Sequence, residues 1–401
     1  MMRRINIGDF KITPEDRQAI EGVLESGRIT EHNQTKEFER EWADVIGTKY
    51  AVAVNSGTSA LIAGLHSLKH LANNDKRRKV ITSPVTYVAT SNAIKLSGLE
   101  PVYGDIDRQT FALKSSEIER ILEENDPSEF LAVLPVHLMG FPCDMDEINK
   151  IAKANKLFVF EDSAQAHGSM YKGRQCGSLG DLSDFSFYVA HNIQAGELGA
   201  INTNNPQIKS LIKQIKANGR VCVCDTCQRM ENGCPQMDSY GSGEDFEPRF
   251  THDVLGFNFK TCEFTTALAR NKLKEMGTIN DIRRKNVQYL NQGLEGHSDV
   301  LQLPQYSEDV SYLGYPLVVK NGQRKQIRAE LEKRGIETRI LFGCIPTQQP
   351  SFRDLQPRYQ GKLPNADHVG KHGFYIGVHQ FLEREDLDYI IQNFNEVLEN
   401  R

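Results

Sequence analysis

The sequence of 401 residues lacks the long apolar segments that membrane proteins need. No run of about 18 apolar residues occurs, so we expect no membrane-spanning helix. The N-terminal stretch MMRRINIGDFKITPEDRQAI also lacks the apolar centre of a secretory signal, and we therefore expect a cytoplasmic protein. An internal repeat and a low-complexity segment are likewise missing.

A strong net charge is also absent. The chain carries 48 Lys and Arg against 53 Asp and Glu, which gives a net charge of −5 at pH 7. Nucleic acids and anionic membranes are bound by clustered Lys and Arg, so we expect neither as a partner. The one dense basic run, residues 76–79, precedes an expected strand and is interpreted as a solvated turn. The composition, 39% hydrophobic and 25% charged, is typical of a globular protein.

Short apolar segments alternate with helical patterns over the first half of the chain. This alternation predicts an α/β fold with a mostly parallel sheet and helices on both faces. One expected strand, Phe185–Tyr188, leads into a polar loop. The segment 218–253 is irregular, Cys-rich and too long for an ordinary connection. We expect a large cofactor-binding domain over residues 1–264 and a smaller α+β domain over residues 265–401.

A segment of small residues, AVNSGTSAL at 53–61, joins an expected strand to an expected helix. Gly57 allows a ligand to approach the backbone, the hydroxyl groups add donors, and a helix N-terminus carries partial positive charge. The pattern therefore fits a site for an anion such as phosphate. Taken alone, it fits an ordinary helix N-cap as well.

Two further positions stand where strands are expected to end. In LFVFEDSAQAHG, residues 157–168, Asp162 ends a buried strand, where it can meet a cofactor or serve as an N-cap. In SPVTYVATSNAI, residues 83–94, Tyr87 stands at a strand-to-helix junction. Its ring can stack on a planar ligand, but the pattern favours a core position.

These motifs, in this order, resemble the DegT/DnrJ/EryC1/StrS sugar aminotransferases, a family of pyridoxal-phosphate enzymes. The resemblance runs nearly from end to end and implies the type I fold of aspartate aminotransferase. The segments that carry it are GRITEHNQTKEFEREWADVIGTKYAVAVNSGTSAL, GDIDRQTFAL, EDSAQAHGSMYKGRQCGSLGDLSDFSF and LGFNFKTCEFTTALARNKL.

The resemblance implies how the cofactor phosphate is held. Gly57 and Thr58 would bind it from one side and Ser186 from the other. Asn258, in LGFNF, would reach it across the interface of a homodimer. The active site would then be shared between two subunits.

The resemblance also implies how the pyridine ring is held. Tyr87 would stack on the ring, and Gln165 would lie near its O3′ atom. Asp162 would pair with the protonated ring nitrogen, which keeps the ring able to accept electrons.

One residue departs from the family pattern. In SFYVAHNIQAGELGA, residues 186–200, His191 stands where the family usually has the lysine that forms a Schiff base with the cofactor. An imidazole cannot form an imine, but it can transfer a proton near neutral pH. This exchange resembles one branch of the family, the 3-dehydratases of nucleotide-linked 4-keto-6-deoxyhexoses, which use pyridoxamine phosphate in deoxysugar pathways such as O-antigen synthesis. Arg339 and Gln349, within residues 335–352, are candidate contacts to the sugar nucleotide.

Other interpretations of His191 remain open. The chain fits a sugar aminotransferase with a displaced lysine, for which Lys172 and Lys260 are the candidates. It also fits a non-catalytic homologue that binds sugar nucleotides, with His191 as a structural residue. Leu198 stands where the family favours glycine, and this second departure in the loop is compatible with a structural role for His191.

Four cysteines, Cys222, Cys224, Cys227 and Cys234, lie close together in the irregular segment. This density suggests zinc or an iron–sulfur cluster, and four reduced thiols are the alternative. By resemblance, one dehydratase subtype carries a [2Fe–2S] cluster and takes electrons from a reductase partner. The other recharges its cofactor from L-glutamate. Ala164 stands where the first subtype has a cluster cysteine, which favours the cluster-free subtype.

Overall fold

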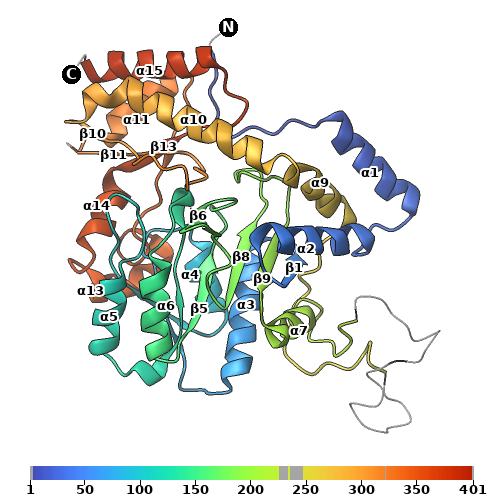
Figure 1. The fold of residues 1–401 in the computed structure, drawn as a ribbon. Coiled ribbons are helices and arrows are strands. Elements are labelled where there is room, and N and C mark those ends of the chain that lie inside the picture. The colour runs from blue at the N-terminus through green and yellow to red at the C-terminus, as the bar shows by residue number, and fades with distance from the viewer. Residues whose placement is uncertain (1–2, 225–233, 235–246, 321, 400–401) are drawn as a thin grey trace.

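The computed structural model describes residues 3–224, 234, 247–320 and 322–399 (Figure 1). A seven-stranded sheet, in the order β1-β9-β8-β5-β4-β2-β3, forms the centre of the larger body. Four of its strand pairs are parallel, and β9 runs antiparallel to both of its neighbours. The expected mostly parallel sheet is therefore confirmed. Its strands are β1 Tyr50–Val54, β2 Lys79–Thr82, β3 Glu100–Tyr103, β4 Phe130–Leu134, β5 Phe158–Asp162, β8 Leu182–Ser186 and β9 Gly199–Thr203.

Helices cover both faces of this sheet, as expected. One apolar cluster joins α3, α4 and α7 to one face, and two others join α5, α6 and α2 to the opposite face. The alternation of buried strands and amphipathic helices accounts for this three-layer arrangement. The helices of the larger body are α1 Pro14–Ser26, α2 Asn33–Ile46, α3 Gly57–Ala72, α4 Ala89–Leu96, α5 Ser115–Glu123, α6 Met145–Ala154, α7 Pro206–Ile215 and α9 Glu263–Leu273.

A second, antiparallel sheet of four strands, β10-β11-β13-β12, follows in the C-terminal part. The long helix α10 and the C-terminal helix α15 lie beside each other on this part (Figure 1). Its strands are β10 Leu301–Gln302, β11 Tyr315–Val319, β12 Arg339–Ile340 and β13 Gly373–Ile376. Its helices are α10 Met276–Leu294, α11 Arg324–Lys333, α12 Ile345–Gln348, α13 Gln356–Tyr359, α14 Pro364–His372 and α15 Arg384–Glu399. The N-terminal Ile5 forms a bridge to Ile336 of this part. The domain boundary after residue 264 stays a prediction.

Two details differ from the sequence analysis. β8 spans Leu182–Ser186, whereas the expected strand was Phe185–Tyr188. The observed strand therefore starts three residues earlier and ends two residues earlier than expected. Buried polar residues within β8 hid its start, and Tyr188 is exposed. A short hairpin, β6 Met170–Tyr171 and β7 Arg174–Gln175, was not expected. Among the described residues, no helix combines the length and apolarity needed to span a bilayer.

Candidate functional site

The start of α3 forms one side of the candidate site. The helix begins at Gly57, directly after β1, and the Ser56 side chain caps it by accepting a hydrogen bond from Ser59 N at 3.1 Å. A Cβ atom on Gly57 would lie only 2.6 Å from the Cβ of Ser186, at the end of β8. Gly57, Thr58 and Ser186 therefore meet where the unbonded N–H groups of a helix N-terminus favour an anion.

Asp162 ends β5, which is separated from β1 by the two strands β9 and β8. Its side chain is buried, Oδ2 accepts a hydrogen bond from Thr90 Oγ1 at 2.7 Å, and Oδ1 accepts one from Ala164 N at 3.4 Å. Burial raises the pKa of Asp162, while the bond from Thr90 acts in the opposite direction. The carboxyl group is thus positioned from α4, a contact that the sequence analysis missed because Thr90 carries no local signal.

Tyr87 lies at the same edge of the sheet, but not in the core. Its exposed fraction is 60%, so the expectation of a core position was wrong. The ring lies edge-on to Phe342 with 6.1 Å between centroids, and the Tyr87 carbonyl accepts a hydrogen bond from Thr90 N at 3.3 Å. Residues 83–86 of the loop after β2 are buried, and Tyr87 is the first exposed residue before α4 begins. Gln165 is nearly buried, and its Oε1 accepts a bond from Met139 N at 2.8 Å.

His191 lies in the connection between β8 and the antiparallel β9. Phe187 N donates to the Leu198 carbonyl at 2.9 Å, and His191 N donates to the Tyr188 carbonyl at 2.9 Å. The next residue, Asn192, donates through Nδ2 to Asn280 Oδ1 at 3.1 Å and to the Ser311 carbonyl at 2.9 Å. The loop is therefore tied to α10 and to the segment before β11. Leu198 is buried in the apolar cluster beneath the loop.

The surroundings of His191 keep its imidazole neutral. Burial, and then the charge of Arg283, lower the pKa of His191 to about 4. Arg283 is itself buried, and its Nη1 donates to the carbonyls of Tyr312 and Leu313 at 3.2 and 3.0 Å. The ring of His167 lies edge-on to His191 at 5.9 Å. At neutral pH, the imidazole of His191 is therefore uncharged, the form that can accept a proton. Nothing in the sequence pattern indicated Arg283.

Asn258 is exposed beside the anion site of its own chain. It forms a bridge with Ala217, and the neighbouring Phe259 carbonyl accepts a hydrogen bond from Asn55 N at 2.9 Å. The segment that carries Asn258 is thus attached to the end of β1. Its contact with the phosphate of a second subunit stays a prediction.

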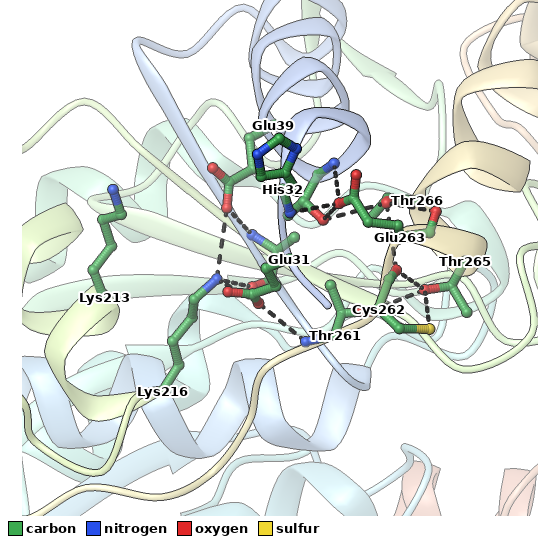
Figure 2. A network of polar contacts seen from close by, with 12 residues as sticks. Glu31, His32, Glu39, Lys213, Lys216, Thr261, Cys262, Glu263, Thr265 and Thr266 are labelled. Atoms are coloured by element: carbon green, nitrogen blue, oxygen red, sulfur yellow. Dashed lines mark hydrogen bonds and ion pairs between the residues drawn. The ribbon is translucent and has the colours of Figure 1, made fainter. Parts of the chain in front are cut away.

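A partly buried ionic network lies beside this end of β1 (Figure 2). Lys216 Nζ points at two carboxylates, with Glu31 Oε1 at 2.9 Å and Glu39 Oε1 at 3.7 Å, and it also donates to the Ala53 carbonyl at 2.7 Å. Ala53 N in turn donates to Glu39 Oε1 at 2.8 Å. Beside this network, the Glu263 carboxylate accepts hydrogen bonds from three backbone N–H groups at the start of α2, those of His32, Gln34 and Thr35.

The two candidate substrate residues are placed differently. The segment of Gln349 reaches the loop of Tyr87, because Ile345 N donates to the Pro84 carbonyl at 2.8 Å. Arg339, in contrast, is exposed on β12 and forms an ion pair with Glu337 at 3.2 Å. Among the described residues, no contact joins Arg339 to the cofactor positions. Its role in substrate binding stays a prediction.

The alternative lysines lie away from the loop of His191. Lys172 is exposed between β6 and β7 and pairs with Asp146, and Lys260 is exposed after Phe259. Of the four clustered cysteines, Cys222, Cys224 and Cys234 belong to the described residues and Cys227 lies outside them. Within the described part of the chain, no group of three or more His, Cys, Asp or Glu side chains is arranged to hold a metal ion.

Comparison with known proteins places this site in a family context. The sequence profile of the DegT/DnrJ/EryC1/StrS aminotransferase family matches residues 11–395. The dTDP-4-dehydro-2,6-dideoxy-D-glucose 3-dehydratase of Saccharopolyspora spinosa is 32% identical over 395 residues, which cover 95% of this chain and 84% of that protein. The GDP-perosamine synthase of Escherichia coli O157:H7 is 30% identical over 98% of this chain and 99% of that protein.

Solved structures agree with these sequence matches. E. coli GDP-4-keto-6-deoxy-D-mannose-3-dehydratase with bound hydrated pyridoxal phosphate superposes with a TM-score of 0.85 at 25% identity, covering 98% of this chain and 100% of that one. A histidine-to-asparagine variant of the same kind of dehydratase, with bound GDP-perosamine, gives the same TM-score, identity and coverage. The fold is therefore the type I fold of pyridoxal-phosphate enzymes, as expected.

Proposed function

Since the chain belongs to the DegT/DnrJ/EryC1/StrS aminotransferase family, we propose that it removes the 3-hydroxyl group of a nucleotide-linked 4-keto-6-deoxyhexose with pyridoxamine phosphate as cofactor. The observation that carries the proposal is His191. It lies in the β8–β9 loop, where by the resemblance the family usually has its lysine, and burial together with Arg283 lowers its pKa to about 4. A neutral imidazole in this place supports proton transfer, and it cannot itself form an imine with the cofactor.

The described residues fit pyridoxal phosphate and its amine form. The helix N-terminus at Gly57 offers N–H groups to a phosphate, and the 2.6 Å approach to Ser186 leaves no room for a side chain there. Buried Asp162 offers a carboxyl group to a protonated ring nitrogen. When bound, the cofactor supplies an amine that condenses with the sugar ketone and a ring that accepts electrons.

The protein side chains supply the proton transfers. Asp162 accepts a hydrogen bond from the ring nitrogen and keeps that nitrogen protonated. Neutral His191 takes a proton from the C4′ carbon, and its imidazolium gives a proton to the departing hydroxyl oxygen. The charge of Arg283 disfavours the imidazolium, so His191 passes the proton on rather than keeping it. Tyr87 covers the ring on its exposed side.

We further propose that L-glutamate restores the amine form of the cofactor and that the active protein is a cytoplasmic homodimer. Ala164 supports the glutamate route, because by the resemblance the iron–sulfur subtype has a cluster cysteine at this position. The segment with Cys222, Cys224, Cys227 and Cys234 would then be a metal-free loop that needs no reductase partner. An aminotransferase is the alternative, supported by the 30% identity to GDP-perosamine synthase.

The test is substitution of His191 in the full-length protein, assayed with dTDP- and GDP-linked 4-keto-6-deoxyhexoses. We expect H191A to keep its cofactor and to lose turnover by roughly 10²–10⁴-fold, the usual contribution of an acid–base group. H191K is expected to bind pyridoxal phosphate covalently, so that borohydride reduction labels residue 191.

Two results contradict the proposal. Dehydration by H191A at a rate near that of the wild type removes His191 from the chemistry. A phosphopyridoxyl-lysine in reduced wild-type protein, at Lys172, Lys260 or elsewhere, indicates an aminotransferase.

A further inference from the structure

A second buried carboxyl group lies beside Asp162. Asp184 of β8 is fully buried, and it is the register partner of Asp162 in the parallel pair of β5 and β8. Register partners on neighbouring parallel strands project from the same face of a sheet, and such strands lie about 4.8 Å apart. The two carboxyl groups therefore leave the sheet side by side (the strands are adjacent in Figure 1).

Neighbouring residues place Asp184 directly beneath the cofactor positions. Two pairs earlier in the register, and so on the same face of the sheet, Phe160 and Leu182 both lie against Gly64 of α3, at 2.5 and 3.1 Å from the position of a Cβ atom there. Two residues beyond Asp184, Ser186 lies against the first residue of α3. Asp184 thus lies under the first two turns of α3. It stands between Asp162, where the proposal puts the cofactor ring, and Ser186, where it puts the cofactor phosphate.

Little among the described residues compensates a charge on Asp184, since only its own backbone N–H lowers its pKa, and this is the smallest of the three influences on that pKa. Neither of its carboxyl oxygens has a hydrogen-bond partner there. β9 and residues 57–65 of α3 contain no charged side chain. Burial and the charge of Asp162 both raise the pKa of Asp184 well above its usual value. Asp162 has Thr90 and the nearby charge of His137 to favour its ionised form. The negative charge therefore belongs to Asp162 and the proton to Asp184.

We propose that Asp184 is a positioning residue that carries a proton beside ionised Asp162 near neutral pH and ionises at higher pH, and so extends the pH range over which the ring nitrogen stays protonated. The inference rests on the proposed function, which places that nitrogen at Asp162. As the pH rises, Asp184 releases its proton to water before the ring nitrogen does. The second negative charge then holds the ring proton more tightly.

The test follows the ring nitrogen of bound ¹⁵N-labelled pyridoxal phosphate by NMR between pH 6 and pH 10. The chemical shift of this nitrogen reports its protonation and not turnover. In D184N, which has the shape of the neutral acid and cannot ionise, we expect the ring nitrogen to lose its proton about one pH unit lower than in the wild type, a tenfold weaker hold. The matched control is D181N. Asp181 precedes β8 at its other end and accepts a bond from Val159 N at 2.8 Å; its variant should titrate like the wild type.

A second measurement uses the cofactor-free protein. Its infrared spectrum at pH 7 should contain a protonated-carboxyl band that D184N lacks. Where D184N does not fold, the smaller D184S serves in both experiments.

The outcomes separate the two claims. A D184N protein that binds pyridoxal phosphate and titrates like the wild type overturns this inference alone, as does an infrared band that is unchanged in D184N. A wild-type protein that binds no pyridoxal phosphate overturns the proposed function, and the role of Asp184 with it.

Discussion

Asn192 in the β8–β9 loop donates a hydrogen bond of 3.1 Å to Asn280 in α10. Asn280 also donates to the His167 carbonyl at 2.8 Å, so one helix side chain holds both the loop of His191 and the segment after Asp162. The position of His191 over the site is thus set by α10, which packs on the second sheet.

Removal of the Asn192–Asn280 hydrogen bond should lower the turnover rate more than it lowers the affinity for pyridoxal phosphate. We expect N280A to lower turnover about 10- to 100-fold, because a loosely held base is misplaced, and to lower the free energy of unfolding by about 1–3 kcal/mol. The measurements are turnover, pyridoxal phosphate affinity and urea unfolding. N286A is the control on the same helix, since Asn286 donates instead to the Val378 and His379 carbonyls, both at 3.3 Å. Equal losses of activity in both variants would show that the link to the loop has no special role.

The phosphate end of the site should not tolerate a side chain at residue 57. In G57A, the new Cβ atom would lie 2.6 Å from the Cβ of Ser186, so the helix must shift and its N–H groups leave their positions. We expect pyridoxal phosphate to bind at least about tenfold more weakly. In G277A, the matched control, the new methyl group has no neighbour within 4 Å, and the protein should gain about 0.5–1 kcal/mol of stability. Unchanged affinity in a folded G57A protein would place the phosphate elsewhere.

The buried histidines near Arg283 should make the fold sensitive to acid. Burial and then Arg283 lower the pKa of His379 to about 4, against smaller opposite effects of Asp9, the Asn6 backbone and Asp386. The unfolded chain binds a proton at this histidine below about pH 6.5 and the folded chain does not, so stability is lost as the pH falls from about 6.5 to 4.

This contribution can be measured as a difference between variants. Between pH 7 and pH 5 the wild type should lose about 2 kcal/mol more than H379Q in urea unfolding. Subtraction removes the opposite effect of the buried carboxyl groups of Glu39, Asp162 and Asp184, whose pKa values are raised. H70Q, a change at an exposed histidine, should follow the wild type. An equal loss in H379Q would mean that His379 is protonated in the folded protein.

The visible spectrum should distinguish the two dehydratase subtypes. We expect protein purified without oxygen to show no iron–sulfur absorption, and added L-glutamate to convert bound pyridoxal phosphate to its amine form. Iron–sulfur colour together with inertness to glutamate would contradict the argument from Ala164 and would call for a reductase partner. Pyridoxal phosphate in buffer with glutamate serves as the control without protein.

Local patterns were sufficient for much of the fold and for part of the site. The candidate anion site at Gly57 depends on a strand, a turn and a helix that are adjacent in sequence. The alternation of apolar segments predicted the central strands. Asp162 was found because a carboxylate after a buried strand is a local signal. The position of β8 was less exact, since the buried polar residues Ser183 and Asp184 do not look like part of a strand.

The remaining parts of the site depend on residues far apart in the chain. Thr90 meets Asp162 across 72 positions, and Asn192 meets Asn280 across 88. Arg283 lowers the pKa of His191 from another helix. Such contacts leave no periodic pattern in one sequence. The exposure of Tyr87 was likewise decided by where the loop leaves the sheet and not by its own residue type.

The large sequence separation between Glu263 and the start of α2 also has a consequence for the synthesis of the polypeptide chain. This residue accepts the N–H groups at the start of α2 from 229 positions away at Gln34, and among the described strands β1 pairs only with β9. A nascent chain therefore carries an unpaired β1 until β9 has left the ribosome, and an uncapped α2 until residue 263 has done so. At about 5–20 residues per second the second interval lasts roughly 11–46 s. The candidate anion site, which directly follows β1 and whose Asn55 N bonds to the Phe259 carbonyl, is therefore completed only late in synthesis.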